Sequence, residues 1–342
     1  MPSAWPAWPA ETEAKPVPRL PWAFRLVCRQ PLSGRPKTIV PALLRAPALC
    51  LLLCLLPSLA RADGDTLVLG RISDDPKAHY DQLKPLLDYV VPRMKDVGIN
   101  HGRILMAKDD RQMASYLRSG RVDWVTETAA SGILLRQRAG AVPMLLTGRS
   151  GVQRYASLLF VRRDSPIQRI GDLRGGSIAF QNPGSTSAYF VPAYELLSRG
   201  LKLEIQISPM DRPDDGRVGY VFARTERNIA TWVVKGLVDA GVVSDLDWND
   251  PARMPKAYRD QLRELHVSAD FPRALELVSA KMKPEVRARL KQVLIDAQHD
   301  PKAAKALAAF FGTTGFAPID AKAQRQLDYI DTAVTRVRRE VE

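Results

Sequence analysis

Three consecutive hydroxyl residues, Ser185, Thr186 and Ser187, carry the strongest chemical signal in the chain. Residues 172–183 before them have the pattern of a short strand that ends in a tight turn, and a helix is expected to begin at the hydroxyls. Such a helix start leaves four backbone N–H groups without intrahelical partners and bears partial positive charge. Because Gly184 lets a ligand approach the backbone closely, the turn predicts a site for an oxyanion such as a phosphate or phosphonate. The alternative is that Ser185 or Thr186 only caps the helix.

The elements that would position this turn alternate between strands and amphipathic helices, which is typical of an α/β fold with mainly parallel sheets. We expect strands at residues 66–70, 103–107, 122–126, 142–146, 155–161, 177–180, 203–207, 218–222 and 238–243. Amphipathic helices are expected between them, among others at 186–198 and 225–235. After Pro251 the pattern changes: strands are expected at 262–267 and 274–279, and only helices beyond Pro284.

Two strands are predicted to cross between two lobes, one starting at Tyr155 and one near His266. We expect lobe one to consist of residues 63–154 plus 266–342, and lobe two of residues 155–265. Ligands of open α/β units bind outside the carboxyl ends of the strands. Two such units that face each other would therefore hold a ligand in the cleft between them.

Residues 1–62 are predicted to be a leader followed by a secretory signal peptide. Basic residues precede the apolar run at 48–56, and Ala60-Arg61-Ala62 gives an A-x-A cleavage pattern. All three cysteines lie in this prefix, so the mature chain would have neither disulfides nor thiol chemistry. The formal net charge is +13, and nearly half of it belongs to the prefix. The remainder favours an anionic ligand only weakly, and export argues against a nucleic-acid partner.

Motifs of common enzyme classes are missing from the sequence. It has no H-E-x-x-H, no G-x-S-x-G, no S-x-x-K and no G-K-[ST] segment. The four histidines are scattered without the spacing of metal ligands: His79, His101, His266 and His299. We therefore expect no catalytic residues, no metal and no cofactor.

The chain resembles the periplasmic substrate-binding component of phosphate/phosphite/phosphonate ABC transporters. The segments that carry the resemblance are 86–90, 120–124, 155–165, 172–175, 183–189, 236–241 and 283–287. It implies a two-lobed type II periplasmic-binding-protein fold with a hinge of two crossing strands. It also implies that the protein captures a phosphate-, phosphite- or phosphonate-like oxyanion in the interlobe cleft, in the periplasm, for an ABC importer.

Within this family the Ser-Thr-Ser turn grips the oxyanion, which favours the ligand-binding interpretation of Ser185, Thr186 and Ser187. Tyr155 on the crossing strand and Tyr189 after the turn are candidate aromatic residues of the same pocket.

Two segments depart from the family pattern. Thr126 and Glu127 stand where relatives often carry an aromatic residue and Gly-Pro, and Glu226 stands where relatives often carry His-Asp. A carboxylate that faces the cleft would repel a bare dianion. It could instead pair with an amine on the ligand, or with Arg224 or Arg227; alternatively, Glu226 only complements a helix dipole. We keep Thr126, Glu127 and Glu226 as candidate site residues and leave the ligand open.

The resemblance implies two partners, a small oxyanion and an ABC permease in the inner membrane, and we expect a monomer. The same hinge closure would serve an exported ligand-sensing protein that signals to a membrane partner, because ligand binding shifts the open–closed population in both cases. Binding of a different small ligand also stays open.

Overall fold

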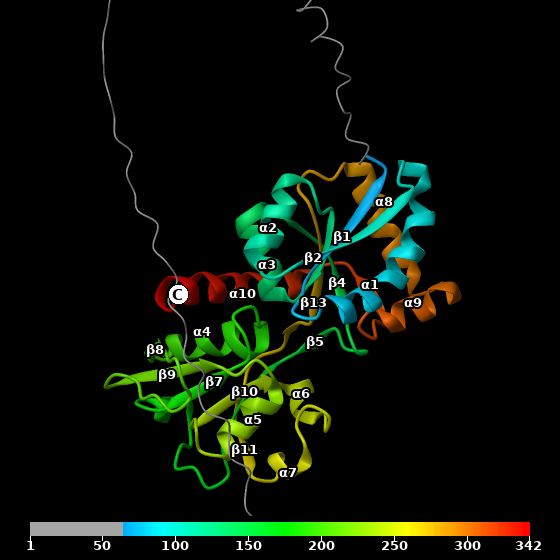
Figure 1. The fold of residues 1–342 in the computed structure, drawn as a ribbon. Helices are drawn as coiled ribbons and strands as arrows, with labels where there is room; N and C mark the ends of the chain where they lie inside the picture. The colour runs from blue at the N-terminus through cyan, green and yellow to red at the C-terminus, as the bar shows by residue number, and fades with distance from the viewer. Residues whose placement is uncertain (1–63) are drawn as a thin grey trace, which may run out of the picture. The chain divides into compact units, whose positions relative to one another are not determined.

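The computed structural model describes residues 64–342, and the predicted leader and signal peptide lie outside these residues. Two sheets of six strands each carry helices on both faces (Figure 1). A two-stranded ribbon connects the two sheet-and-helix units, which we call lobe one and lobe two. This architecture confirms the predicted α/β class. No helix within residues 64–342 is long and apolar enough to cross a membrane.

Lobe one is built on a mixed sheet in the order β14-β4-β13-β3-β1-β2. Its strands are β1 (Thr66–Ile72), β2 (His101–Ala107), β3 (Trp124–Glu127), β4 (Val142–Gly148), β13 (Ala274–Val278) and β14 (Gly315–Ala317). Strands β1, β2 and β3 run parallel, whereas β13 is antiparallel to both of its neighbours. Its helices are α1 (Pro76–Val90), η2 (Val91–Val97), α2 (Asp110–Ser119), α3 (Ala129–Ala139), α8 (Pro284–Ala297), η5 (Pro301–Ala303) and α9 (Ala304–Ala309).

The helices of lobe one pack against both faces of this sheet. Asp75 caps α1 by accepting a hydrogen bond from the N–H of Ala78 at 3.1 Å, and the apolar face of α1 is buried at Leu83, Leu86 and Val90. Helices α1, α8 and α9 share one core with Trp124, whereas α2 and α3 pack into the core on the other face. The sheet is therefore covered on both sides, and its strand ends are left to form a site.

Lobe two is built on a sheet in the order β11-β6-β10-β7-β9-β8. Its strands are β6 (Ser157–Arg162), β7 (Ser177–Phe180), β8 (Lys202–Ile205), β9 (Arg217–Phe222), β10 (Ala240–Ser244) and β11 (Leu262–Val267). Its helices are η3 (Ile170–Leu173), η4 (Thr186–Phe190), α4 (Val191–Ser198), α5 (Glu226–Val234), α6 (Asp245–Asn249) and α7 (Lys256–Arg259). Strands β7, β8, β9 and β10 are parallel, so the loops after β7 and β9 leave the same edge of the sheet.

Two short antiparallel strands connect the lobes: β5 (Arg154–Tyr155) pairs with β12 (Phe271–Pro272). The rings of Tyr155 and Phe271 pack edge to face, with 4.8 Å between their centroids. His266 lies in β11, within the sheet of lobe two. The predicted domain boundaries stay predictions, and we propose to move the second one from residue 266 to about residue 270.

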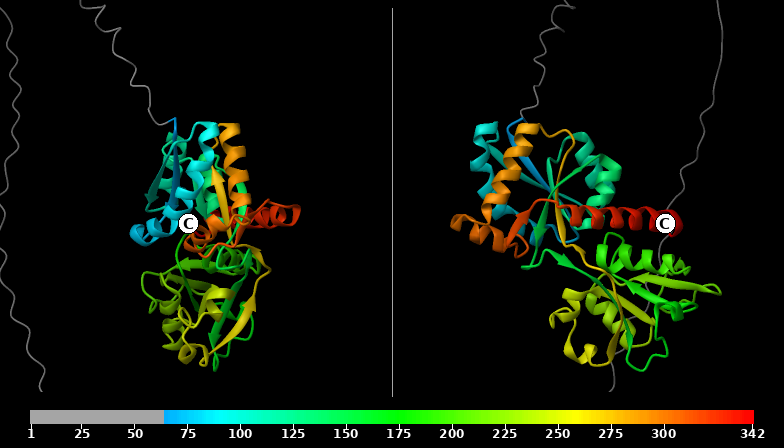
Figure 2. Two further views of the ribbon diagram at one scale, coloured as in Figure 1. Left: turned by 90° about the vertical axis from the view of Figure 1, so that its right-hand side faces the viewer. Right: turned by 180° about the vertical axis from the view of Figure 1, so that it is seen from behind.

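The C-terminal helix α10 (Ala321–Glu340) packs on α3 of lobe one and on α4 of lobe two (Figure 2). Asp331 pairs with Arg136 of α3 at 3.0 Å, and the Nη2 of Arg336 donates to the carbonyl of Leu197 at 3.0 Å. The last helix therefore braces both lobes.

One expectation about the end of the chain is wrong, because the residues beyond Pro284 are not only helical. Gly315–Ala317 forms the edge strand β14, which pairs antiparallel with β4. A strand of three residues is too short to show an alternating pattern, and an apolar residue such as Phe316 is equally compatible with the buried face of a helix.

Candidate functional site

The two lobes contact each other where the loop after β3 meets the loop after β7. The backbone N–H of Ala130, in the first turn of α3, donates to the hydroxyl of Thr186 at 2.9 Å. Beside it, the hydroxyl of Ser131 donates to the carbonyl of Gly184 at 3.2 Å. The Ser-Thr-Ser turn of lobe two therefore lies directly against a helix N-terminus of lobe one.

This contact supplies a cap that α3 lacks in its own lobe. Thr128 occupies the cap position of α3 but makes no side-chain capping bond, and its Oγ1 is buried without a hydrogen-bond partner within residues 64–342. The hydroxyl of Thr186 accepts a hydrogen bond from one of the N–H groups that lack intrahelical partners at a helix start. The dipole of α3 thus places partial positive charge at the same point as the hydroxyls of lobe two.

The Ser-Thr-Ser turn is buried and held by its own lobe. The hydroxyl of Ser185 accepts a hydrogen bond from the N–H of Ala188 at 3.1 Å, so Ser185 does cap the following helix. The carbonyl of Ser187 accepts a hydrogen bond from the hydroxyl of Ser157. The turn is followed by a π-helical segment, in which the N–H of Phe190 donates to the carbonyl of Ser185 at 3.0 Å. The continuous α-helix that the periodicity predicts from residue 186 is therefore wrong for its first turn. Single π-turns of this kind are frequent at functional sites.

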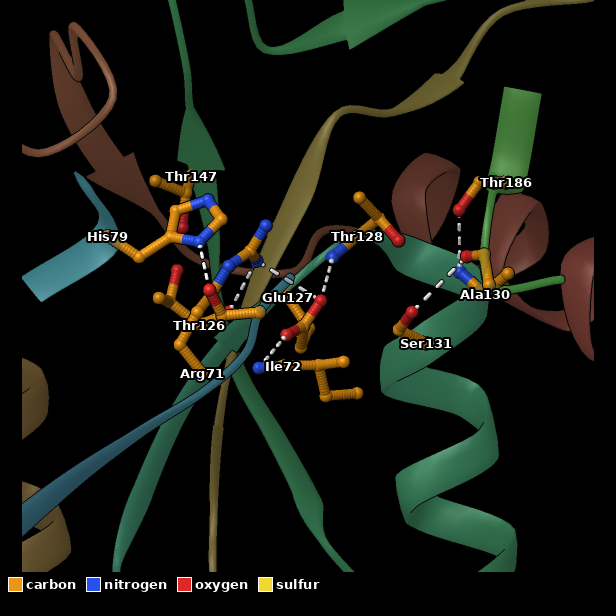
Figure 3. Close-up of polar contacts among 12 residues, drawn as sticks. Arg71, Ile72, His79, Thr126, Glu127, Thr128, Ala130, Ser131, Thr147 and Thr186 are labelled. Carbon is orange, nitrogen blue, oxygen red and sulfur yellow. Dashed lines mark hydrogen bonds and ion pairs between the residues drawn. The ribbon is translucent and has the colours of Figure 1, made fainter. Parts of the chain in front are cut away.

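Glu127 ends β3, and its carboxylate is fully engaged within lobe one. It pairs with the guanidinium of Arg71 at 3.1 Å and accepts hydrogen bonds from the N–H groups of Ile72, at 2.8 Å, and Thr128, at 3.3 Å (Figure 3). The side chain of Glu127 is almost completely buried. The departure from the family pattern at Glu127 therefore does not present a free negative charge to a ligand.

Thr126 belongs to a buried network around Glu276. The Glu276 carboxylate accepts hydrogen bonds from Trp124 Nε1 at 2.6 Å, Thr126 Oγ1 at 2.7 Å and Thr147 Oγ1 at 2.6 Å. Burial raises the pKa of Glu276 to about 7. The Nη2 of Arg149 donates to Thr126 Oγ1 at 2.8 Å, and burial together with repulsion from Arg71 lowers the pKa of Arg149 to about 9. The hydroxyl of Thr126 thus links the buried carboxyl of Glu276 and the buried guanidinium of Arg149 by hydrogen bonds.

Glu226 is the first residue of α5, so it also complements the dipole of that helix. Its partners are Gln181, which donates through Nε2, and Arg253, whose Nη1 lies 3.2 Å from the carboxylate. Burial, followed by repulsion from Asp247, raises the pKa of the Glu226 carboxyl.

The two predicted arginine partners of Glu226 are engaged differently. Arg227 donates to the carbonyl of Ala252 at 3.3 Å, whereas Arg224 is exposed, with a left-handed backbone (φ 71°). The cation that neutralises Glu226 is therefore Arg253, which lies 27 residues further along the chain.

The two candidate tyrosines lie in packed surroundings. Tyr189 is fully buried, and its ring packs against those of Phe180 and Phe222 with 5.3 and 5.0 Å between centroids. Burial raises the pKa of Tyr189 well above its usual range. Tyr155 is 3% exposed, with the guanidinium of Arg273 4.6 Å from its ring centroid. Because neither ring has a free face, we propose no ligand contact for Tyr155 or Tyr189.

A family model described as "ABC transporter, phosphonate, periplasmic substrate-binding protein" matches residues 71–324. The chain belongs to this family. Among solved structures, XAC2383 from Xanthomonas citri is 50% identical in a form bound to chloride ion and 49% identical in a form bound to ATP. Both forms align with a TM-score of 0.78 over 81% of this chain and 100% of theirs.

More distant phosphonate-binding proteins share the fold. PhnD1 from Prochlorococcus marinus, in complex with methylphosphonate, is 14% identical, with a TM-score of 0.59 over 80% of this chain and 99% of that one. The binding component PA3383 of a phosphonate transporter from Pseudomonas aeruginosa is 19% identical, with a TM-score of 0.56 over 80% and 88%. These likenesses confirm the predicted type II periplasmic-binding-protein fold. The chain therefore belongs to a family of periplasmic substrate-binding components of ABC transporters.

Three arginines around the candidate site were not predicted from the sequence. Arg71 lies at the carboxyl end of β1 and Arg149 directly follows β4, so the rule that ligands bind outside strand carboxyl ends could have found both. Arg253 lies in an irregular turn between α6 and α7, where no pattern marks it.

Proposed function

We propose that this protein is exported to the periplasm and captures a small phosphonate- or phosphate-like oxyanion between its two lobes for an ABC permease. The contact of Thr186 with the N-terminus of α3 carries the proposal, because it brings three hydroxyl residues and the positive ends of two helices to one point. Ser185, Thr186 and Ser187 would bind the oxyanion from lobe two, and the first turn of α3 would bind it from lobe one.

The charges around this point support an anionic ligand. Arg71 pairs with Glu127 and Arg253 pairs with Glu226, so the two carboxylates that departed from the family pattern are both neutralised. A dianion would therefore meet helix N-termini and hydroxyl donors without an unpaired carboxylate nearby. Ligand contacts shared by two lobes favour the closed state, which is the form a permease partner would recognise.

A nucleotide is the second candidate ligand, because the relative from Xanthomonas citri that is 49% identical is bound to ATP. A triphosphate offers the same oxyanion chemistry at its terminal phosphate, and it carries more charge. If the ligand is a small oxyanion, a phosphonate or phosphate should bind more tightly than ATP; if it is a nucleotide, ATP should bind most tightly. One experiment therefore distinguishes the two candidate ligands.

The test is a thermal-shift and calorimetric titration of the purified protein with phosphate, phosphite, methylphosphonate, 2-aminoethylphosphonate and ATP. A ligand at 100 times its dissociation constant stabilises the folded state by about 2.7 kcal/mol. We expect at least one phosphonate or phosphate to bind with micromolar or better affinity. Stabilisation by ATP alone would favour the nucleotide, and failure of all five ligands would contradict the proposal.

The membrane partner that the protein stimulates distinguishes a role in transport from a role in ligand sensing. We expect the ligand-loaded protein to be monomeric by size-exclusion chromatography, to bind no nucleic acid, and to stimulate the ATPase activity of its permease in vesicles. Stimulation of a signalling protein in place of an importer would instead support the ligand-sensing alternative.

A further inference from the structure

Arg149 is a buried cation that lacks a charged hydrogen-bond partner. It follows β4 and is 4% exposed, and its Nη2 donates to the neutral hydroxyl of Thr126 at 2.8 Å. Its Nε is buried and has no hydrogen-bond partner within residues 64–342. A buried charge is costly unless it is paired and hydrogen-bonded, so this arginine is incompletely satisfied as it stands.

A second guanidinium lies beside it on the same aromatic ring. The guanidinium carbon of Arg149 is 4.4 Å from the ring centroid of Phe311, and that of Arg71 is 5.1 Å from it. The imidazole of His79 also packs on Phe311, at 5.8 Å between centroids. Two guanidinium groups that repel each other therefore stack on the same aromatic ring.

Two carboxylates near this pair, Glu127 and Glu276, attract Arg149 through space, but its side-chain hydrogen bond goes to the neutral Thr126 and not to either of them. Glu127 is taken by Arg71 at 3.1 Å, and Glu276 is held by three neutral donors in a place where burial raises its pKa to about 7. Repulsion from Arg71 and Arg273 adds to burial in lowering the pKa of Arg149 to about 9. A group whose charged form is disfavoured in this way gains from a nearby anion.

The backbone around Phe311 is strained. Ser150 (φ 51°) and Phe311 (φ 54°) both adopt the left-handed region without being glycine, and the N–H of Ser150 donates to the carbonyl of Phe311 at 2.9 Å. Such strain persists only where the surroundings over-determine it. The pairing fixes the aromatic ring against the end of β4, and with it the position of Arg149.

We propose that Arg149 and Arg71, stacked on Phe311, form a second anion subsite on lobe one, so that the natural ligand carries a second anionic group besides its oxyanion head. The inference rests on the proposed function, with the head bound at the Ser185–Ser187 turn. Thr126 accepts a hydrogen bond from Arg149 in the second subsite, and Ala130 donates one to Thr186 in the first. Because Thr126 and Ala130 are four residues apart, their Cα atoms are separated by at most about 14 Å. The ligand class is a phosphonocarboxylate or a compound with linked phosphates.

The test compares ligands that differ only in their second group. Methylphosphonate has an apolar tail, 2-aminoethylphosphonate a cationic one and phosphonoacetate an anionic one, whereas pyrophosphate supplies a second phosphate. Calorimetric titration of the wild-type protein is expected to show phosphonoacetate or pyrophosphate binding at least about tenfold tighter than methylphosphonate, as a further charge-assisted contact implies. The tighter of the two identifies the second group as carboxylate or phosphate.

Arg149→Gln is expected to reduce this preference to less than about threefold. Arg93→Gln is the matched control, because Arg93 also stacks on an aromatic ring (3.6 Å from the centroid of Tyr89) and pairs with an acid, Asp300, at 3.0 Å. It should leave the preference unchanged. If Arg149→Gln does not fold, Arg149→Lys replaces it; the ammonium keeps the charge but loses the planar fork, so the preference should shrink without vanishing.

Four results would overturn the subsite. One is equal affinity of the wild type for methylphosphonate, phosphonoacetate and pyrophosphate, and another is tightest binding of 2-aminoethylphosphonate. The third is an equal loss for every ligand in Arg149→Gln, which would make Arg149 a purely structural residue. If the wild type binds none of these ligands and neither phosphate nor phosphite, the proposed function fails, and the subsite falls with it. Binding of phosphate or phosphite without phosphonoacetate or pyrophosphate would overturn the subsite alone.

Discussion

The hydroxyl of Thr186 in lobe two accepts a hydrogen bond from the backbone N–H of Ala130 in lobe one, at 2.9 Å. One side chain therefore joins the predicted oxyanion turn to the N-terminus of a helix in the opposite lobe. The donor that Thr186 satisfies is of the kind that an oxyanion would also bind. A ligand that enters here would exchange one direct interlobe bond for several bonds to each lobe, which links binding to closure.

Replacement of Thr186 by Val tests this link. The variant keeps the shape of the side chain but leaves the N–H of Ala130 without its acceptor, at a cost of about 1–3 kcal/mol. We expect a lower melting temperature and at least a tenfold loss of affinity for the best oxyanion, measured by calorimetry. Thr186→Ser keeps the hydroxyl and should retain most of the affinity. Equal behaviour of the two variants would show that the hydroxyl has no role in closure.

The double variant Ser185→Ala/Ser187→Ala tests the oxyanion turn itself. Each serine that donates to a charged ligand contributes roughly 1.5–3 kcal/mol, so the affinity should fall by two orders of magnitude or more. The loss of the Ser185 cap on Ala188 should cost about 1 kcal/mol of stability as well. Ser119→Ala/Ser208→Ala removes two serine hydroxyls outside the turn and serves as the control. Unchanged affinity in the first variant would leave the turn serines as structural caps only.

Glu226→Gln separates two interpretations of that carboxylate. Because Arg253 already pairs with Glu226 at 3.2 Å, we expect the affinities for 2-aminoethylphosphonate and for methylphosphonate to change by the same factor. A selective loss of 2-aminoethylphosphonate binding would mean that Glu226 binds a ligand amine, as the sequence left open. The calorimetric comparison of the two ligands decides between them.

The buried carboxyl of Glu276 should make stability depend on pH. Burial raises its pKa to about 7 in the folded protein, above its ordinary value of 4.5. The folded state therefore holds the proton more tightly than the unfolded state, and the stabilisation from this group is full below about pH 4.5 and is lost as the pH rises through 7. The free energy of unfolding should decrease by about 3 kcal/mol from this group over that range.

Glu276→Gln, which cannot ionise, is expected to remove this part of the pH dependence. Denaturant titrations of both proteins between pH 4.5 and 8 measure it. Parallel stability curves for the two proteins would show that Glu276 does not titrate in this range.

Processing at the predicted signal peptide is tested by N-terminal sequencing of exported protein. We expect the mature chain to begin at or near Asp63, directly after Ala60-Arg61-Ala62. A mature protein that still begins at Met1 or Pro2 would contradict the prediction.

Much of the architecture could be predicted from the sequence because alternation and helical periodicity extend over long segments. The strands at Ser177–Phe180 and Arg217–Phe222 lie where the sequence predicted them, to within one residue. The edge strand β14 and the crossing at Phe271–Pro272 were not predicted, because strands of two or three residues have no readable period.

The site was harder to predict than the fold. The Ser-Thr-Ser turn was visible because hydroxyls, glycine and a helix start occur together in sequence. Its contact with Ala130, the pairing of Glu226 with Arg253, and the stacking of Arg149 on Phe311 join residues far apart in the chain. Such contacts depend on how the lobes pack, which no local pattern encodes. For the same reason the sequence did not show that Tyr189 is buried against Phe180 and Phe222.

A crystal structure of the protein with its tightest-binding oxyanion tests the central claim most directly. The account predicts that the phosphorus atom lies between the lobes, with its oxygens within hydrogen-bond distance of the Ser185–Ser187 turn and of the first turn of α3. A ligand bound elsewhere would contradict it, for example in the cavity of about 480 Å³ beside α9 that is lined by Gln298, Asp300 and Thr313.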